Sequence, residues 1–376
     1  MLRCRIWGLG TMTIPSPLFR ALLLMPTGLL LISCGGGGGG GGSTATPSTP
    51  APLTSTWSIP QELVVDGGPG KDGIPSIDNP VFELTSADTD TRGHWLVVGV
   101  RYNGETKAYP HNILNYHEIV NDGLAGAPFT LHYCPLTGSA MAWEGDPGAT
   151  DPTFGVSGLL YESNLILYDR ESDSHWSQML EESVEGERVG EVPNRIQIIE
   201  TTMATWLSMY PDSQILSQDT GHFREYDVSP YGNYTTHDFL IFQTSSTDNR
   251  LHIKERVIGI RSDTDSKAFQ IAGFGATTQT INEQFDNRPI VAVGNSSANI
   301  AAIYSRELSD GTILTFSPLD GQLPNIMQDN EGNVWDVFGT AVSGDRTGTT
   351  LAKTNSYSAM WFAWTSFNET TALHFN

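Results

Sequence analysis

Cysteine is scarce in this chain, which has three in 376 residues. Cys4 and Cys34 lie near the N-terminus, and Cys134 stands alone in the rest of the sequence. A domain that follows Cys34 therefore cannot be cross-linked by an intrachain disulfide. Such a domain depends on the burial of apolar side chains, at roughly 25 cal/mol per Å².

Basic residues are also few. The chain has 20 Lys and Arg against 42 Asp and Glu, which gives a formal net charge of −22. A surface of this sign repels nucleic acid and anionic lipid. We therefore expect no nucleic-acid partner, and we interpret the acidity as a means of keeping an exported protein soluble. The 39% of hydrophobic residues is ample material for a packed core.

The N-terminal segment has the layout of a secretory signal peptide. An uncharged apolar run from Ala21 to Ser33 follows three arginines and is too short to span a bilayer comfortably. The run ends in Leu-Ile-Ser-Cys at positions 31–34, which resembles the bacterial lipobox, the site where a cysteine thiol receives lipid before cleavage. We therefore predict that residues 1–33 are a lipoprotein signal peptide and that Cys34 is the lipidated residue.

A tether is predicted between the anchor and the folded domain. Glycine fills positions 35–42, and STATPSTPAPLTST follows, so residues 34–56 offer almost no side chains for a core. The globular domain is expected at 57–376. In a host with two membranes, Gly35 after the lipidated cysteine is similar to the pattern sent to the outer membrane. We expect an exported protein, lipid-anchored to the cell envelope on its periplasmic side.

Short β-type segments recur from His94 onward. They are rich in Val, Ile, Leu, Tyr and Thr, and clusters of Gly, Asp, Asn and Pro separate them. Helical patterns are fewer and cover 111–122, 201–210 and 356–367. We find no repeat at the periods of solenoids or propellers and no second linker. The sequence predicts a mainly β (α+β) fold: one antiparallel β-rich domain with a few packed helices.

Familiar catalytic motifs are incomplete in this chain. The segment from His117 to Asn121 begins like the H-E-x-x-H of zinc proteases, but Asn121 stands in place of the second histidine. The glycine-rich turn around Lys71 lacks the first glycine and the Ser or Thr of a phosphate-binding loop. None of these segments carries a function by itself.

The thiol of Cys134 ends a segment, Leu131 to Cys134, that is typical of a strand. Because side chains alternate along a strand, His132 and Cys134 are expected on the same face. A free cysteine is most often a small buried hydrophobe, but in an oxidising compartment it is open to oxidation, so a functional role competes with the structural one. For each nearby histidine a hydrogen-bonded structural role is the simpler interpretation, and for Asp169 it is an ion pair with Arg170.

Several blocks of sequence resemble a bacterial family known as a domain of unknown function, DUF 3179. The blocks are KDGIPSIDNPVF (71–82), AYPHNILNYHEIVND (108–122), YCPLTGSAMAW (133–143), FGVSGLLYESNLILYDRESDSHWSQ (154–178), TWLSMYPDSQILSQDTGHFREYDVSPYGNY (205–234), KERVIGI (254–260) and the WFAW segment. They cover nearly the whole predicted domain. The resemblance implies an exported or envelope setting and brings no established reaction with it.

The family signature centres on the H-E-I-V-N-D and Y-C-P-L segments, which this chain matches from His117 to Asp122 and from Tyr133 to Leu136. The chain departs from it at Thr137, where many relatives resemble C-P-L-C, so a site with two thiols is not available. His132 and His175 also stand where the family is associated with other residue types.

Three functions are consistent with these residues. The first is a mononuclear copper or zinc site with Cys134 and His117 as ligands, completed by His132, His175 or Glu118, since a thiolate with two imidazoles suits either metal.

The second is a cysteine-nucleophile hydrolase or transferase. Cys134 would attack an acyl group, with His117 or His175 as the general base and Asp122 or Asp169 orienting it. The third is a non-catalytic envelope binding or scaffold domain, with tryptophan-lined surfaces for a glycan or a protein. The lipid anchor makes the membrane a partner in all three, and the protein or small-molecule partner stays open.

Overall fold

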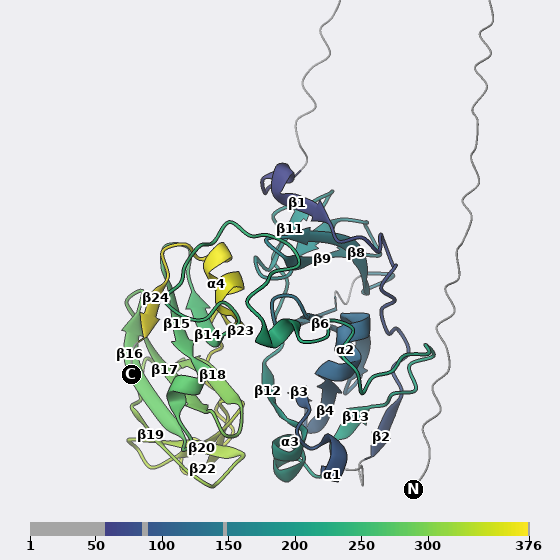
Figure 1. Cartoon of the computed structure of the whole chain (residues 1–376). Coiled ribbons are helices and arrows are strands. Elements are labelled where there is room, and N and C mark those ends of the chain that lie inside the picture. The colour runs from purple at the N-terminus through teal and green to yellow at the C-terminus, as the bar shows by residue number, and fades with distance from the viewer. Residues whose placement is uncertain (1–56, 85–88, 146–148, 375–376) are drawn as a thin grey trace, which may run out of the picture. The chain divides into compact units, whose positions relative to one another are not determined.

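Strands dominate the computed structural model, which describes residues 57–84, 89–145 and 149–374 (Figure 1). Strand residues make up 42% and helix residues 11%, and the predicted mainly β fold with antiparallel sheets is confirmed. The predicted signal peptide, the tether and Cys34 lie outside the described residues. Within the described ranges, no helix is long and apolar enough to cross a membrane.

The first half of the domain consists of three sheets and short helices. Its main sheet has the order β12-β3-β4-β13-β2, with bounds Ile198–Thr202, Leu96–Tyr102, Glu105–Pro110, Gln214–Leu216 and Phe82–Leu84. A three-stranded sheet contains β5 (Ile119–Leu124), β6 (Ala127–Cys134) and β7 (Ser139–Glu144). A third sheet contains β1 (Val64–Asp66), β8 (Phe154–Tyr161), β9 (Asn164–Asp169), β10 (His175–Ser177) and β11 (Glu182–Glu185). The helices are η1 (Gln61–Leu63), α1 (Thr89–Arg92), α2 (His111–His117) and α3 (Met203–Met209).

The second half has the same three kinds of sheet. Its main sheet has the order β23-β14-β15-β24, with bounds Ser356–Met360, Arg256–Arg261, Ser266–Gln270 and Ala372–His374. A three-stranded sheet contains β16 (Gln279–Phe285), β17 (Arg288–Asn295) and β18 (Ile300–Ser305). The last sheet contains β19 (Phe316–Pro318), β20 (Asn325–Asp329), β21 (Val334–Asp336) and β22 (Ala341–Ser343). The helices are η3 (Ile271–Phe274) and α4 (Trp361–Phe367), and η2 (Tyr234–Thr236) lies between the halves.

The two halves are copies of one supersecondary unit. In both main sheets the first three strands are antiparallel and the fourth is parallel to the third: β12-β3-β4-β13 corresponds to β23-β14-β15-β24. The central hairpins align without a gap, VVGVRYNGETKAY at 97–109 with VIGIRSDTDSKAF at 257–269. We call β1 to β13 the first copy and β14 to β24 the second copy.

A glycine under a tryptophan fixes the same helix onto the same sheet in each copy. A Cβ atom on Gly99 would lie 2.0 Å from the ring of Trp206 in α3, and a Cβ on Gly259 would lie 2.3 Å from Trp364 in α4. Both indoles also donate a hydrogen bond to the hydroxyl seven residues on, at 2.8 Å from Trp206 and 2.9 Å from Trp364. Only glycine permits this close contact between helix and sheet.

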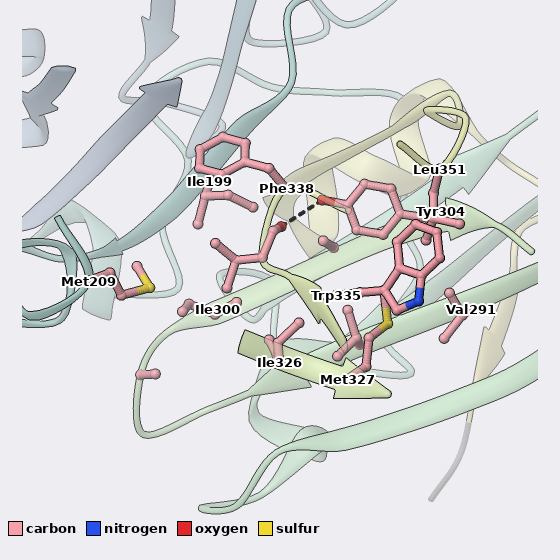
Figure 2. Close-up of a cluster of buried hydrophobic side chains, with 14 of the residues drawn as sticks. Ile199, Met209, Val291, Ile300, Tyr304, Ile326, Met327, Trp335, Phe338 and Leu351 are labelled. Carbon is pink, nitrogen blue, oxygen red and sulfur yellow. Dashed lines mark hydrogen bonds between the residues drawn. The ribbon is translucent and has the colours of Figure 1, made fainter. Parts of the chain in front are cut away.

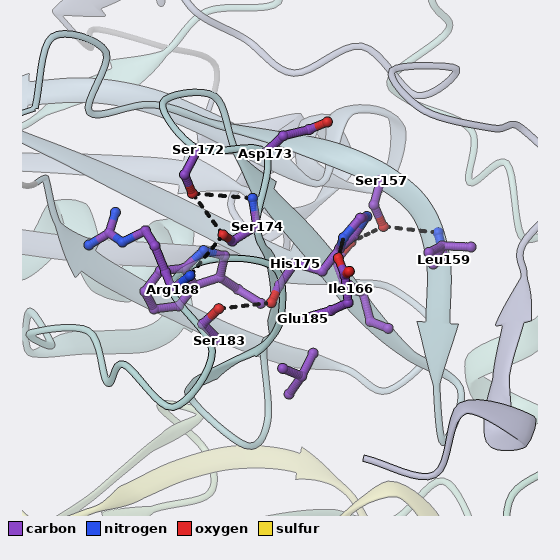
Figure 3. Close-up of polar contacts among 12 residues, drawn as sticks. Ser157, Leu159, Ile166, Ser172, Asp173, Ser174, His175, Ser183, Glu185 and Arg188 are labelled. Carbon is purple, nitrogen blue, oxygen red and sulfur yellow. Dashed lines mark hydrogen bonds and ion pairs between the residues drawn. The ribbon is translucent and has the colours of Figure 1, made fainter. Parts of the chain in front are cut away.

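A second shared device is a hairpin closed by an aspartate. Asp169 accepts a hydrogen bond from the indole of Trp176 at 2.8 Å, and Asp329 accepts one from Trp335 at 2.9 Å. Figure 3 shows the turn of the first copy, where the backbone N–H of Arg188 donates to Ser174 Oγ at 3.2 Å. The buried carboxylates therefore hold hairpins in place.

The copies share one hydrophobic core. Figure 2 shows Ile199 and Met209 of the first copy in the same cluster as Ile300, Tyr304 and Trp335 of the second copy. The contacts between the copies are reciprocal: β12 contacts β18, and β23, the counterpart of β12, contacts β7. The described residues from 57 onward accordingly form one compact unit.

Two of the predicted helices are shorter than the sequence pattern indicates. The helix predicted at 111–122 ends at His117, because Glu118 adopts φ 57° and the chain continues as β5. In the helix predicted at 356–367, the first five residues instead form β23 on β14, and only Trp361–Phe367 is helical. The helix predicted at 201–210 is present as α3.

Candidate functional site

Cys134 lies at the end of β6 and is 1% exposed. Its thiol is directed at the carbonyl oxygen of Ser163, with Sγ and O separated by 3.7 Å. Burial, together with the nearby carboxyl of Glu118, raises the pKa of the thiol to about 11. The resting cysteine is therefore protonated at neutral pH.

His132 is fully buried two residues before Cys134. Its ring centroid lies 4.1 Å from that of Trp143, which packs in the same apolar cluster as Cys134, so the expected shared strand face is present. Gln178 Nε2 donates to His132 Nδ1 at 3.0 Å. Burial lowers the pKa of His132 to about 3, so the imidazole is neutral.

Thr137, which stands in place of a second family cysteine, belongs to a buried hydrogen-bond network. Its hydroxyl lies 2.8 Å from the Ser139 hydroxyl and accepts from Asn164 Nδ2 at 3.0 Å. Asn164 and Ser139 both donate to Gln178 Oε1, at 2.7 Å each. These bonds connect Thr137 to the Gln178 side chain that holds His132.

His117 is the last residue of α2 and is fully buried. Its Nδ1–H donates to the carbonyl of Pro75 at 2.8 Å, and its Nε2 then accepts from the Tyr226 hydroxyl at 2.7 Å. Burial lowers the pKa of His117 to about 4. Both ring nitrogens of a neutral imidazole are thus in use.

The remaining predicted residues also have local partners. His175 begins β10 and lies 2.9 Å from Glu185, and Asp169 closes its hairpin on Trp176 instead of pairing with Arg170, which lies 3.1 Å from Asp78. Asp122 accepts from Lys107 Nζ at 2.9 Å. Among the described residues, no group of three or more His, Cys, Asp and Glu side chains is placed to hold a metal ion.

The structure therefore does not bring the sequence-predicted sets together. The proposed metal ligands His117, His132, Cys134 and His175 form no cluster. None of the hydrogen bonds of the described region joins Cys134 to His117 or to His175, so the proposed cysteine–histidine pair is not formed.

The side chain that does accompany Cys134 is Glu118. It caps α2 with its backbone N–H on the carbonyl of Leu114 at 2.8 Å, and its positive φ turns the chain into β5. The carboxyl is 6% exposed, and the Tyr231 hydroxyl donates to its Oε1 at 3.4 Å. Burial raises the pKa of Glu118 to about 7. This acid can hold or release a proton near neutral pH.

Two further polar groups complete the cluster. Tyr231 and Tyr234 pack with Cys134 in one apolar cluster, and the Lys254 ammonium lies 2.9 Å from the centroid of the Tyr234 ring. Neither the Tyr234 hydroxyl nor Lys254 Nζ has a hydrogen-bond partner among the described residues. Burial lowers the pKa of Lys254 to about 7. We call Glu118, Cys134, Tyr231, Tyr234 and Lys254 the acid–thiol site.

The acid–thiol site belongs to the first copy and is covered by the segment that joins the copies. Residues 217–255 connect β13 to β14, contain only η2 within their bounds, and supply Tyr231, Tyr234 and Lys254. In the second copy Gln279 and Asn295 occupy the positions of Glu118 and Cys134, because Ile119 pairs with His132 as Thr280 pairs with Val293. The pair of titratable side chains, Glu118 and Cys134, is therefore present in the first copy only.

A family model described as a protein of unknown function, DUF3179, matches residues 71–371. The chain belongs to the DUF3179 family. No curated protein and no solved structure shows significant similarity to it.

All five residues of the acid–thiol site lie inside the matched DUF3179 region and come from four separate blocks of it. Sequence reasoning considered Glu118 only as a metal ligand and did not single out Tyr231, Tyr234 or Lys254. These residues stand in the SPYGNY and KERVIGI blocks, so their place in family blocks was the available signal.

Proposed function

We propose that this DUF3179 protein is an exported lipoprotein, anchored through Cys34, whose acid–thiol site transfers or hydrolyses an acyl group. The observation that carries the proposal is a buried Glu118 carboxyl near enough to raise the pKa of the Cys134 thiol, together with Tyr234, which packs with Cys134 and carries the Lys254 ammonium over its ring.

The chemistry uses each group in one role. The Glu118 carboxylate takes the proton of the Cys134 thiol, and Sγ forms a bond to the carbonyl carbon of the substrate. The carbonyl π electrons move to oxygen, where the Lys254 ammonium stabilises the negative charge. Collapse of this intermediate expels the leaving group, which takes the proton from Glu118 and leaves an acylated Cys134. Water or a second nucleophile then attacks the thioester and releases the thiol.

The energy of the first step is compatible with catalysis. Moving the proton from a thiol of pKa about 11 to an acid of pKa about 7 costs about 5 kcal/mol. A turnover of about ten per second corresponds to a total barrier of roughly 16 kcal/mol. The proton transfer therefore takes about a third of the available barrier.

The geometry favours this reaction over a copper or zinc site. A metal on Cys134 and His117 would require His117 to give up its bonds to Pro75 and Tyr226. The carboxyl of Glu118, in contrast, is near enough to raise the pKa of the Cys134 thiol, and it accepts a hydrogen bond from Tyr231.

Acylation of the full-length protein in detergent tests the proposal. With p-nitrophenyl acetate we expect a burst of about one equivalent and an acetyl adduct on Cys134 in the mass spectrum. Cys134→Ser and Glu118→Gln should both lose the adduct while keeping the circular dichroism of the parent. Gln279→Ala, at the exposed counterpart of Glu118, is the matched control and should keep it.

A parent that stays unacylated, with a thiol that resists iodoacetamide until the fold is denatured, contradicts the acyl-transfer proposal. The non-catalytic binding or scaffold domain would then be the better description.

A further inference from the structure

A cavity of about 640 Å³ lies in the second copy, on the surface of the three-stranded sheet. Its floor is apolar and consists of Ile260, Phe285 and Ile290. Its rim comes from the β14–β15 turn, the end of the β16–β17 hairpin and residues 352–355. A volume of this size is typical of sites for small molecules, which occupy about 300–1,000 Å³.

The first copy has a cavity at the equivalent position. It measures about 170 Å³, and Leu124, Phe129 and Ile196 line it at the counterparts of Phe285, Ile290 and Thr354. The strand registers place these residues in correspondence, since Leu124 pairs with Ala127 as Phe285 pairs with Arg288. A hollow at this point is thus a property of the duplicated unit.

The rims of the two cavities differ in charge. Asp263, Asp286 and Arg288 line the cavity of the second copy, and their side chains make no ion pair or hydrogen bond with other described residues. The counterparts in the first copy are uncharged: Asn103, Ala125 and Ala127. Unpaired side chains of both charges therefore surround the cavity of the second copy, which is the larger of the two.

We propose that this cavity binds a small zwitterion with an apolar body, namely a free amino acid or a short peptide. The Arg288 guanidinium is suited to a carboxylate, which it can hold through two parallel hydrogen bonds. Asp263 and Asp286 are suited to an ammonium group, and the floor of Ile260, Phe285 and Ile290 to an aliphatic side chain. Ion pairs with the two charged ends of the ligand would give each of these rim side chains a partner.

The amino-acid site does not depend on the acid–thiol site. The two share no residue, and they lie in different copies. Failure of the acylation experiment would leave this inference intact, and the reverse also holds.

Isothermal titration of the full-length protein in detergent with L-leucine and with Leu-Leu tests it. At least one of the two should bind saturably in the millimolar range or tighter. Leucine amide lacks the carboxylate, 4-methylpentanoate lacks the ammonium and glycine lacks the side chain, so each should bind at least about tenfold more weakly than leucine, a loss of about 1.4 kcal/mol.

Arg288→Ala, which installs the residue type of Ala127, should weaken binding by about tenfold or more, and Asp286→Asn should also weaken it. Arg288 is exposed and Asp286 is half-buried, and Asn keeps the size of Asp, so neither variant should unfold. Arg224→Ala removes an exposed cation that lines no part of this cavity and is the matched control.

Absence of saturable binding by both probes up to about 10 mM would overturn the inference. So would equal binding of leucine and 4-methylpentanoate, which would indicate a simple anion site, or unchanged binding by Arg288→Ala.

Discussion

Replacing Glu118 by Gln should stabilise the protein in mild alkali and leave its stability unchanged in acid. The carboxyl is 6% exposed, and burial raises its pKa from 4.5 to about 7. A carboxyl whose folded-state pKa lies above its unfolded value binds its proton more tightly in the fold. Its contribution is fully present below pH 4.5 and is lost as the pH rises through 7.

The size of the effect follows from the same values. At about 1.4 kcal/mol per pKa unit, the rise from 4.5 to about 7 corresponds to about 3 kcal/mol of stability lost by pH 8.5. Gln has the shape of the protonated acid, can still accept from Tyr231 and cannot ionise. The variant should therefore exceed the parent by about 3 kcal/mol at pH 8.5 and match it at pH 4.

Urea unfolding of both proteins at pH 4, 5.5, 7 and 8.5, followed by tryptophan fluorescence, measures the difference. Glu307→Gln, at an exposed position, is the control and should follow the parent at every pH. If Glu118→Gln tracks the parent across the range, or is the less stable protein at pH 8.5, Glu118 does not ionise as a buried acid. The role of Glu118 as the base for Cys134 would then lose its support.

Two other substitutions test the anchor and the packing. Cys34→Ala should release the protein from membranes in a carbonate wash, and a variant that still sediments with processed signal would contradict lipidation at Cys34. Gly259→Ala should destabilise the fold by about 3 kcal/mol or more in urea unfolding, because its Cβ would meet the Trp364 ring at 2.3 Å. Gly123→Ala has no atom closer than 3.6 Å and should cost less than about 1 kcal/mol, so similar losses in both would refute the packing argument.

Local patterns were sufficient to predict the fold class. The alternation of side chains along a strand predicted His132 and Cys134 on the same face, and in the structure Trp143 contacts the His132 ring and belongs to the same apolar cluster as Cys134. The predicted ends of two helices were wrong, because a single residue or a neighbouring strand determines where each helix begins or ends. Glu118 ends α2 through a positive φ, and residues 356–360 become a strand because β14 is available to pair with them.

The duplication escaped the sequence analysis because its period is that of a whole unit, far longer than a solenoid repeat. Outside the central hairpin the copies keep only scattered residues, such as Trp206 and Trp364, the tryptophans that cover the hairpin glycines. The candidate site escaped it for a different reason. No sequence motif marks Lys254 or Tyr234 as functional. The pKa of the Lys254 amine is lowered only because the fold buries it, with the ammonium over the Tyr234 ring.

The tandem architecture also gives the molecule an internal standard. Each position in one copy has a counterpart that packs on a similar backbone, inside the same chain and under the same solvent conditions. Exchanges between copies, such as Cys134→Asn or Arg288→Ala, therefore install side chains that this backbone has already accepted. Activity and stability measured on such exchange variants would separate the residues that give one copy its chemistry from those that maintain the fold of both.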